Sequence, residues 1–289
     1  MITIQNERLT AKINELGAEV KSLTMDGTEY IWPGHPDIWK SSCPLLFPVC
    51  GGLKEDSYTY RGEKYPMPRH GFGRTKVFAV ESVTADSAVF LLKASEETKA
   101  VYPFDFELRV RYTLTEQSLQ IGYEVKNLGA ETMYFSIGSH EGYFTPEGVE
   151  DYDIWFDQPE TLNSYVLSGT LLSDNQIPII KEQKCLPLYE KYFMIDTLVF
   201  KDLKSRSALL RNRKTGRAVR VDFPDAKYFM VWHKPGAPYL CLEPWNGVAD
   251  SVDSDQAIET KEGIMTLEAG ETYCNTHTIT IQNEAAKVW

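Results

Sequence analysis

Three short segments of the chain each combine an ionisable side chain with glycine and aromatic residues. They read Pro-Arg-His-Gly-Phe-Gly-Arg at 68–74, Gly-Ser-His-Glu-Gly-Tyr-Phe at 138–144 and Leu-Glu-Pro-Trp-Asn-Gly at 242–247. Glycine lets a backbone turn tightly or approach a ligand closely, and aromatic faces suit the C–H surfaces of a sugar ring. A carboxyl group and imidazoles in such segments are candidates for a general base and a general acid. The segments therefore indicate proton-transfer chemistry on a small molecule.

Glu243 is the carboxyl group with the strongest case. It follows the apolar run Tyr239–Leu242 and precedes Pro244, so we predict that it lies where a strand ends, at the mouth of a pocket. Trp232 and Trp245 accompany it as either core aromatics or platforms for a sugar ring.

A single histidine is more often a structural residue than a catalyst. His35 lies in a Pro-Gly-His-Pro loop and His233 precedes a Lys-Pro-Gly turn, so we predict that both are solvated. His277 alternates within the last predicted strand.

Several kinds of chemistry lack their motifs. The sequence contains no glycine-rich loop followed by Lys-Ser/Thr, no Gly-x-Ser-x-Gly elbow, no His-Glu-x-x-His and no clustered Cys/His ligand set. These absences disfavour nucleotide, serine-hydrolase and zinc chemistry. An acid and a base that act without a cofactor or metal remain.

Composition and charge narrow the partners. Of 289 residues 43% are hydrophobic and 25% are charged, which is enough to build a large core. Lys and Arg number 30 against 41 Asp and Glu, a formal net charge of -11, without a basic run that could follow a phosphate backbone. We expect no nucleic-acid partner and favour a neutral small molecule, although a local arginine cluster could hold one phosphate.

The cysteines and the N-terminus indicate an intracellular protein. The five cysteines form an odd set without Cys-x-x-Cys spacing, so we interpret them as reduced thiols. The N-terminus lacks the basic head and apolar stretch of a secretory signal, and no 18-residue apolar window follows. We expect a cytoplasmic protein without a membrane segment.

Period-two alternation dominates the chain. Phe104, Phe106, Leu108, Val110, Tyr112 and Leu114 alternate with polar residues, and after a turn at 115–118 the alternation resumes at Leu119, Ile121, Tyr123 and Val125. Weaker hairpins are predicted around Asp26-Gly27, at 77–83 with 87–93 and at 207–212 with 217–223, and further strands at 228–232, 239–242 and 276–281. Helical patterning is confined to 94–101 and 253–260. The pattern predicts an all-β fold, a large antiparallel β-sandwich, as one domain over residues 1–283 with a tail at 284–289.

The three segments, in this order along a β-rich chain, resemble the aldose 1-epimerase or galactose mutarotase-like family, and within it a LacX-like bacterial branch. The resemblance spans nearly the whole chain. It also includes Gly17–Val20, the stretch from Val125-Lys126-Asn127 to His140, and the Cys-Leu-Glu-Pro-Trp motif that contains Glu243. It implies a supersandwich of two large antiparallel sheets with an open sugar cleft on one face.

The resemblance also implies roles for individual residues. Glu243 matches the general base that removes the proton from the C1 hydroxyl, and His140 matches the general acid that protonates the ring oxygen. His70 matches a second histidine that binds the substrate near the ring oxygen, and Asp196 matches an aspartate that holds sugar hydroxyls. The family requires neither a metal nor a nucleotide.

One position departs from the family pattern. Galactose mutarotases carry an Asn-Arg pair ahead of the first histidine, with the arginine binding substrate, whereas this chain reads Cys-Gly-Gly-Leu at 50–53. Arg69 or Arg74 would have to replace that arginine from another direction, which leaves the preferred hexose open.

Four functions remain open. The leading hypothesis is an epimerase that acts on the anomeric carbon of a free aldohexose. A phosphosugar epimerase would use Arg69 and Arg74 as a fork for the phosphate. A carbohydrate-binding or sensing protein would retain the cleft without catalysis. A glycosidase that pairs Glu243 with Asp196 is disfavoured, because it leaves both histidines without a role. The sequence does not choose between a monomer and a homodimer.

Overall fold

The clearest period-two pattern of the sequence forms the hairpin of β10 (Phe106–Thr115) and β11 (Ser118–Asn127). Every second side chain of β10 is buried, and the strands pair from Thr115 opposite Ser118 to Phe106 opposite Asn127. The computed structural model describes residues 1–282, so the predicted tail at 284–289 lies outside the described residues. The strand pair read from alternation is confirmed.

The weaker patterns also form strands. They are β3 (Glu19–Met25), β4 (Thr28–Glu29), β8 (Ala79–Val83), β9 (Ser87–Lys93), β18 (Ser207–Asn212), β19 (Ala218–Asp222), β20 (Tyr228–Trp232), β21 (Tyr239–Asn246) and β23 (Thr272–Gln282). The two predicted helical stretches contain only α1 (Glu96–Lys99) and the 3-10 turn η5 (Ile258–Thr260).

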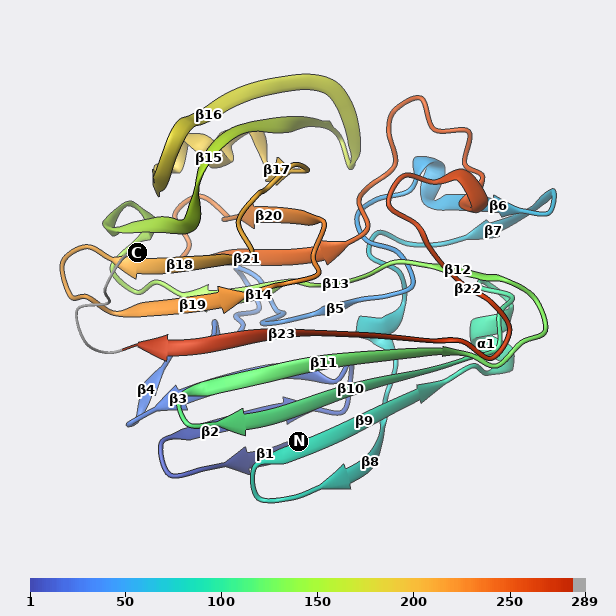
Figure 1. The fold of residues 1–289 in the computed structure, drawn as a ribbon, viewed down its shortest axis with the longest axis horizontal. Coiled ribbons are helices and arrows are strands. Elements are labelled where there is room, and N and C mark those ends of the chain that lie inside the picture. Colours follow the sequence, from blue (N-terminus) through green and yellow to red (C-terminus); the bar gives the residue numbers. More distant parts are fainter. Residues whose placement is uncertain (283–289) are drawn as a thin grey trace.

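Most strands belong to one antiparallel sheet that bends back on itself into layers (Figure 1). Within residues 1–282 this sheet has 15 strands in the order β5-β13-β21-β20-β17-β15-β18-β19-β23-β11-β10-β9-β8, with β14 paired to β21 and β16 paired to β15. The strands not yet bounded are β5 (Leu45–Leu46), β13 (Ile137–Ser139), β14 (Glu141–Phe144), β15 (Tyr152–Ser168), β16 (Leu171–Pro187) and β17 (Leu198–Phe200).

Smaller sheets and turns complete the described chain. β1 (Ile2–Gln5), β2 (Leu9–Asn14), β3 and β4 form a four-stranded sheet that contacts β9 through β1. Two short two-stranded sheets pair β6 (Ser57–Tyr60) with β7 (Glu63–Pro66) and β12 (Met133–Phe135) with β22 (Met265–Leu267). Further 3-10 turns are η1 (Lys54–Asp56), η2 (Gly73–Thr75), η3 (Val149–Asp151) and η4 (Glu190–Ile195).

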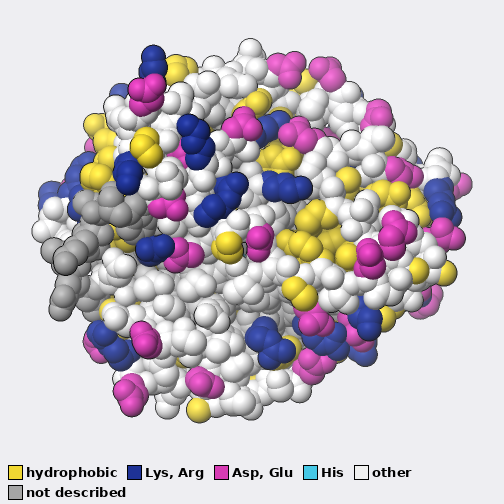
Figure 2. Space-filling model, in the orientation of Figure 1, with side chains coloured by type: hydrophobic (Ala, Val, Ile, Leu, Met, Phe, Trp, Pro, Cys, Tyr) yellow, Lys and Arg dark blue, Asp and Glu magenta, His cyan; other side chains and the backbone are white. Residues whose placement is uncertain are grey.

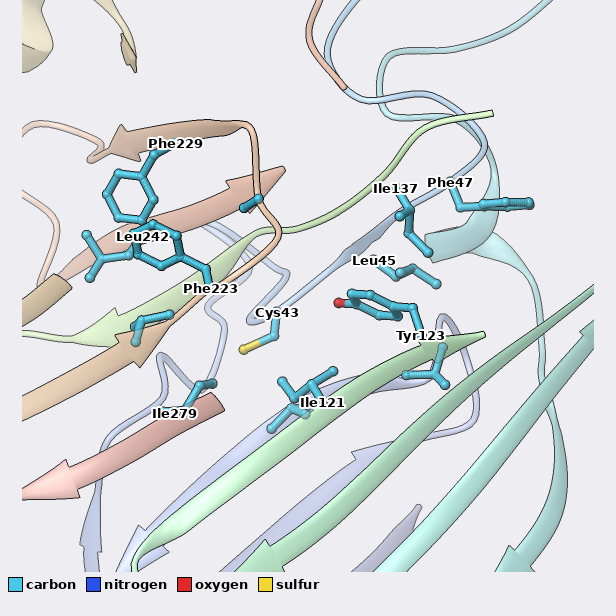
Figure 3. Packing of buried hydrophobic residues seen from close by; sticks show 14 of the residues in the cluster. Cys43, Leu45, Phe47, Ile121, Tyr123, Ile137, Phe223, Phe229, Leu242 and Ile279 are labelled. Carbon is cyan, nitrogen blue, oxygen red and sulfur yellow. The ribbon is translucent and has the colours of Figure 1, made fainter. Parts of the chain in front are cut away.

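The core lies between the layers of the bent sheet. Phe229 and Leu242 enter it from β20 and β21, and Ile121 and Ile279 enter it from β11 and β23 (Figure 3). Cys43 lies between these two sets of side chains. The antiparallel β-sandwich predicted from the sequence is thereby confirmed.

The sequence did not predict the long arm formed by β15 and β16. Each strand is 17 residues long, and the arm arches over β17 and β20 in Figure 1. Much of β16 is exposed, and the pairing between the two strands is interrupted by register shifts. A strand with polar residues on both faces carries no period-two signal, so alternation could not reveal it.

The surface agrees with the charge balance of the sequence. Acidic and basic side chains are interspersed over the face shown in Figure 2. Among the described residues, we find no helix with the length and apolarity needed to cross a membrane.

Candidate active site

One cavity collects the residues singled out in the sequence. Its volume is about 340 Å³, and it is lined by Trp39, Arg69, His70, Arg74, His140, Asp196, Thr197, Trp232, Glu243 and Trp245. All eight residues predicted for the site belong to this lining. The volume lies at the lower end of the range for small-molecule sites. The fold thus brings together three segments that are far apart in the sequence.

Backbone pairing sets His140 against Glu243. In β13, Gly138 lies opposite Trp245 of β21, and β14 continues the same register along β21. His140 occupies the gap between β13 and β14, and this register puts it directly opposite Glu243. The His140 Nε2 atom lies 3.5 Å from Glu243 Oε2.

The predicted position of Glu243 at a strand end was wrong. β21 runs from Tyr239 to Asn246, so Glu243 lies inside a strand whose residues are all buried. Pro244 had suggested an end, because proline cannot donate to a sheet ladder. The ladder is interrupted next to it, in the gap between β13 and β14, so the missing N–H costs little there.

Burial controls the charge of the pair. The side chains of Glu243 and His140 are 1% and 11% exposed, and Glu243 Oε1 and His140 Nδ1 have no hydrogen-bond partner within residues 1–282. Burial raises the pKa of Glu243 well above its ordinary value, against the opposing effect of Arg69. Burial also lowers the pKa of His140 to about 3, with Arg69 acting in the same direction. Both shifts favour the uncharged forms, in which the pair holds one titratable proton, on the Glu243 carboxyl group.

Two glycines make room for the aromatic walls beside this pair. A Cβ atom on Gly138 would lie 2.7 Å from the Trp245 ring, and one on Gly142 would lie 2.7 Å from the Trp39 ring. Both glycines flank His140 at a spacing of two residues, so the rings lie on the same face of the strand as the imidazole. This close approach explains the glycines of the second sequence segment.

His70 enters the cavity from a tight loop. Its φ of 69° is the left-handed conformation that non-glycine residues rarely adopt. The backbone N–H of Gly51 donates to His70 Nδ1 at 3.1 Å. Because Nδ1 accepts this bond, we infer that Nε2 carries the ring proton. Burial, followed by His140 and Arg69, lowers the pKa of His70 well below its ordinary value, so the ring is a neutral hydrogen-bond donor.

Arg69 and Arg74 bring positive charge to the same cavity. Arg74 donates through one terminal nitrogen to the backbone oxygen of Arg69 at 3.0 Å. Neither guanidinium forms an ion pair with a carboxylate of the described chain, and Arg69 Nε has no partner there. Burial, with a smaller effect of Arg69, lowers the pKa of Arg74.

Asp196 reaches the cavity from a strained position. It follows η4 with φ 83° and ψ −113°, a conformation that costs free energy and often marks a functional site. The Thr197 hydroxyl donates to Asp196 Oδ1 at 3.1 Å. Thr197 itself lines the cavity and was not predicted, because a threonine beside a strand carries no distinctive signal.

Aromatic rings surround the two histidines. The centroid of His140 lies 5.2 Å from Trp39 and 5.6 Å from Trp232, and that of His70 lies 5.4 Å from Trp245. Trp39 was missed in the sequence, where it lies in a loop without a neighbouring ionisable motif. Trp232 and Trp245 line the cavity, and their role as platforms for a sugar ring stays a prediction.

The structure brings together one group of possible metal ligands that the sequence motifs did not predict. The ligand atoms of His140, Cys241 and Glu243 all lie within 4.8 Å of one another. Burial, then the charge of Glu243, raises the pKa of the Cys241 thiol well above its ordinary value. A thiol that resists deprotonation is a poor ligand, so this set fits a metal ion badly.

The prediction for His233 was wrong, whereas His35 is exposed as expected. His233 is fully buried, with Nδ1 at 2.6 Å from the Tyr239 carbonyl oxygen and Nε2 at 3.1 Å from Glu190 Oε2. Both ring nitrogens have partners, so the turn that follows His233 does not expose it to solvent.

Comparison with known proteins places this fold and site in a family. The sequence model of the family described as aldose 1-epimerase matches residues 1–280, and the chain belongs to this family. The plasmid-encoded protein LacX of Lactococcus lactis subsp. lactis is 35% identical over 297 aligned positions, which cover 98% of this chain and 99% of LacX.

Solved structures agree with this assignment. A galactose mutarotase related enzyme from Lactobacillus acidophilus is 34% identical with a TM-score of 0.93, covering 100% of this chain and 99% of that one. A galactose mutarotase-like protein from Lactobacillus casei is 28% identical with a TM-score of 0.92, covering 98% and 100% of the two chains. The resemblance to the family and the predicted fold are confirmed.

Proposed function

We propose that this protein is a cofactor-independent aldose 1-epimerase that interconverts the α and β anomers of a hexose by opening and closing the ring. The observation that carries the proposal is the approach of His140 Nε2 to within 3.5 Å of Glu243 Oε2 in a cavity with aromatic walls. The two oxygens of a hemiacetal are bonded to the same carbon. An acid and a base that act on both oxygens must therefore lie near each other, and these side chains do.

The reaction needs one proton taken and one proton given. The Glu243 carboxylate accepts the proton of the C1 hydroxyl as the C1–O5 bond breaks, and protonated His140 donates its proton to O5. The products are an open-chain aldehyde, a carboxylic acid and a neutral imidazole. The aldehyde rotates about C1–C2, and ring closure with the roles reversed returns both protons and delivers the other anomer.

The single proton of the pair suits this exchange. The uncharged pair and the ion pair contain the same number of protons, so the proton can move between the two side chains without uptake from solvent. His70 has a different task, because its Nδ1 is already bonded to Gly51. Its Nε2–H donates a hydrogen bond to a sugar oxygen near the ring oxygen.

A second candidate substrate is a phosphorylated hexose. The guanidinium groups of Arg69 and Arg74 form no ion pair with a described carboxylate. They favour an anionic ligand, because one anion can bind both neighbouring positive charges. Initial rates with glucose and with glucose 6-phosphate distinguish the two. A higher kcat/KM for the phosphate that disappears in Arg74→Gln would favour the phosphosugar.

Anomer exchange followed by NMR or polarimetry tests the proposed function. We expect the protein to accelerate α/β interconversion of a hexose above the buffer rate, and Glu243→Gln to lose that acceleration. If titration shows sugar binding while exchange stays at the buffer rate, the protein is a binding or sensing protein instead.

A further inference from the structure

A second buried polar cluster lies directly behind the cavity, on the opposite face of the strands that carry His140. The His277 Nε2 atom lies 2.7 Å from Glu141 Oε1, and the Ser139 hydroxyl donates to the same carboxylate oxygen. These three residues are at most 4% exposed. Ser139 and Glu141 are the immediate neighbours of His140 in the chain, so their side chains point away from the cavity while the imidazole points into it.

The cluster is not a hydrolytic triad. A triad needs the serine on one imidazole nitrogen and the carboxylate on the other. Here the Ser139 hydroxyl, at 3.4 Å, and the Glu141 carboxylate both contact His277 Nε2. The cavity beside His277 has a volume of about 10 Å³, which is room for no more than one water molecule.

Stability alone gives no reason for this cluster. Burying a carboxylate and an imidazole costs free energy, and replacing such pairs by apolar side chains is often neutral or stabilising. The second carboxylate oxygen of Glu141 and the hydroxyl of Tyr143 are buried without a partner among the described residues. The surrounding positions belong to the apolar core that contains Cys43 and Tyr123. The cluster therefore costs free energy at a position where apolar side chains could extend the surrounding core.

The backbone around His140 needs support that the sheet does not give. β13 ends at Ser139 and β14 begins at Glu141, so the ladder is broken at His140 itself. The imidazole is fixed from one side only, since its Nε2 faces Glu243 Oε2 at 3.5 Å while its Nδ1 has no partner within residues 1–282. The cluster holds the residues on both sides of the gap, and the Trp245 ring nitrogen donates to the Ser139 carbonyl oxygen at 3.1 Å.

We propose that Ser139, Glu141 and His277 are positioning residues, which fix the broken strand from behind and thereby hold the His140 imidazole opposite Glu243. The inference rests on the proposed function for its catalytic consequence. It assigns a purpose to a buried polar cluster that does not line the cavity.

Two variants separate positioning from stability. Glu141→Gln keeps the shape and weakens the bond to His277. Ser139→Ala/Glu141→Met/His277→Leu replaces the whole cluster with apolar side chains, so we expect it to melt within a few degrees of the parent or above it. We expect both variants to lower kcat about 10- to 100-fold, the effect of small misplacements at an active site, with KM changed less than about threefold.

Glu160→Gln is the matched control. Glu160 is a buried carboxylate that accepts from the Ser205 hydroxyl at 2.7 Å in another part of the sandwich. We expect this variant to lose stability without loss of kcat. The inference is overturned if the apolar triple variant regains kcat together with stability, or if Glu141→Gln retains kcat as fully as Glu160→Gln does.

The NMR signal of the His140 ring tests positioning independently of catalysis. Its ¹³Cε1–¹H peak, assigned by its loss in His140→Asn, should shift and broaden in Glu141→Gln and stay unchanged in Glu160→Gln. An unchanged peak in both variants overturns the inference even if the parent exchanges no anomers. If instead neither the parent nor Glu243→Gln exchanges anomers faster than buffer, the proposed function is overturned.

Discussion

His140 and Glu243 lie directly opposite each other on paired antiparallel segments, and their nearest side-chain nitrogen and oxygen are 3.5 Å apart. The register of the flanking strands places the two residues opposite each other, although the ladder is interrupted at His140 itself. The predictions below follow from this arrangement and from the walls built around it.

Gly142→Ala should disturb the cavity wall. The added methyl group would lie 2.7 Å from the Trp39 ring and 3.1 Å from the backbone oxygen of Ser42. Overpacking of this kind costs about 1–3 kcal/mol, which a urea unfolding curve would measure. Gly122→Ala is the control, since its nearest contact would be an ordinary 3.4 Å from the Thr276 hydroxyl. Equal stability of the two variants would contradict the close packing of Trp39.

His70 should remain neutral and protonated on Nε2. The Gly51 N–H occupies its Nδ1, and burial lowers the pKa of the ring well below its ordinary value. Long-range ¹⁵N–¹H NMR spectra should therefore show one neutral tautomer with no titration between about pH 5 and 8. If the His70 ring titrates near its ordinary pKa, or carries its proton on Nδ1, then it is not a fixed neutral donor through Nε2–H.

Single variants of the pair should show opposite dependences of stability on pH. In Glu243→Gln the remaining His140 has a pKa near 3 when folded against 6.5 when unfolded. The unfolded state then binds more protons, so the free energy of unfolding falls as pH decreases from 6.5 towards 3. In His140→Asn the remaining Glu243 has a raised folded pKa. Its folded state binds more protons, so stability falls as pH rises above 4.5.

The slopes are at most about 1.4 kcal/mol per pH unit for each proton, and they cancel in the parent between pH 4.5 and 6.5. Urea unfolding at intervals across that range provides the measurement. Slopes of the same sign in both variants would contradict the opposite pKa shifts that burial gives to His140 and Glu243.

Removal of metal ions should leave the reaction rate unchanged. In the proposed mechanism Glu243 and His140 supply both proton transfers, and burial raises the pKa of the nearby Cys241 thiol, which keeps it protonated. Dialysis against a strong chelator, followed by the anomer-exchange assay, tests this. A rate that falls on dialysis and returns with Zn²⁺ would show that the His140, Cys241 and Glu243 cluster holds a functional metal.

The sequence revealed the fold through alternation, and its successes and failures have the same cause. β10 and β11 bury every second residue, so their existence and pairing followed from period two. β15 and β16 are longer, but much of β16 lies in solvent, where nothing selects apolar residues on one face, and its pairing with β15 shifts register several times. Glu243 looked like the end of a strand because Pro244 follows it. The gap that accommodates this proline is a property of the neighbouring strand, which local sequence cannot show.

The site was predictable where ionisable residues, glycines and aromatics occur together. That combination, with the family resemblance, pointed to His70, His140 and Glu243, and the cavity contains all three. Trp39 does not lie in a segment of this kind, and only tertiary packing brings it to the site. His277 alternates in its strand like its neighbours, and only the fold shows that it meets Glu141 across the core.

The most direct test is the rate of anomer exchange in the parent, Glu243→Gln, His140→Asn and the double variant. General acid–base catalysis contributes about 10²–10⁴-fold for each transfer, so each single variant should slow exchange by a factor in that range. Residues that act as a unit give non-additive losses, so the double variant should be hardly slower than the slower single variant. A Glu243→Gln protein that exchanges anomers as fast as the parent would contradict the account.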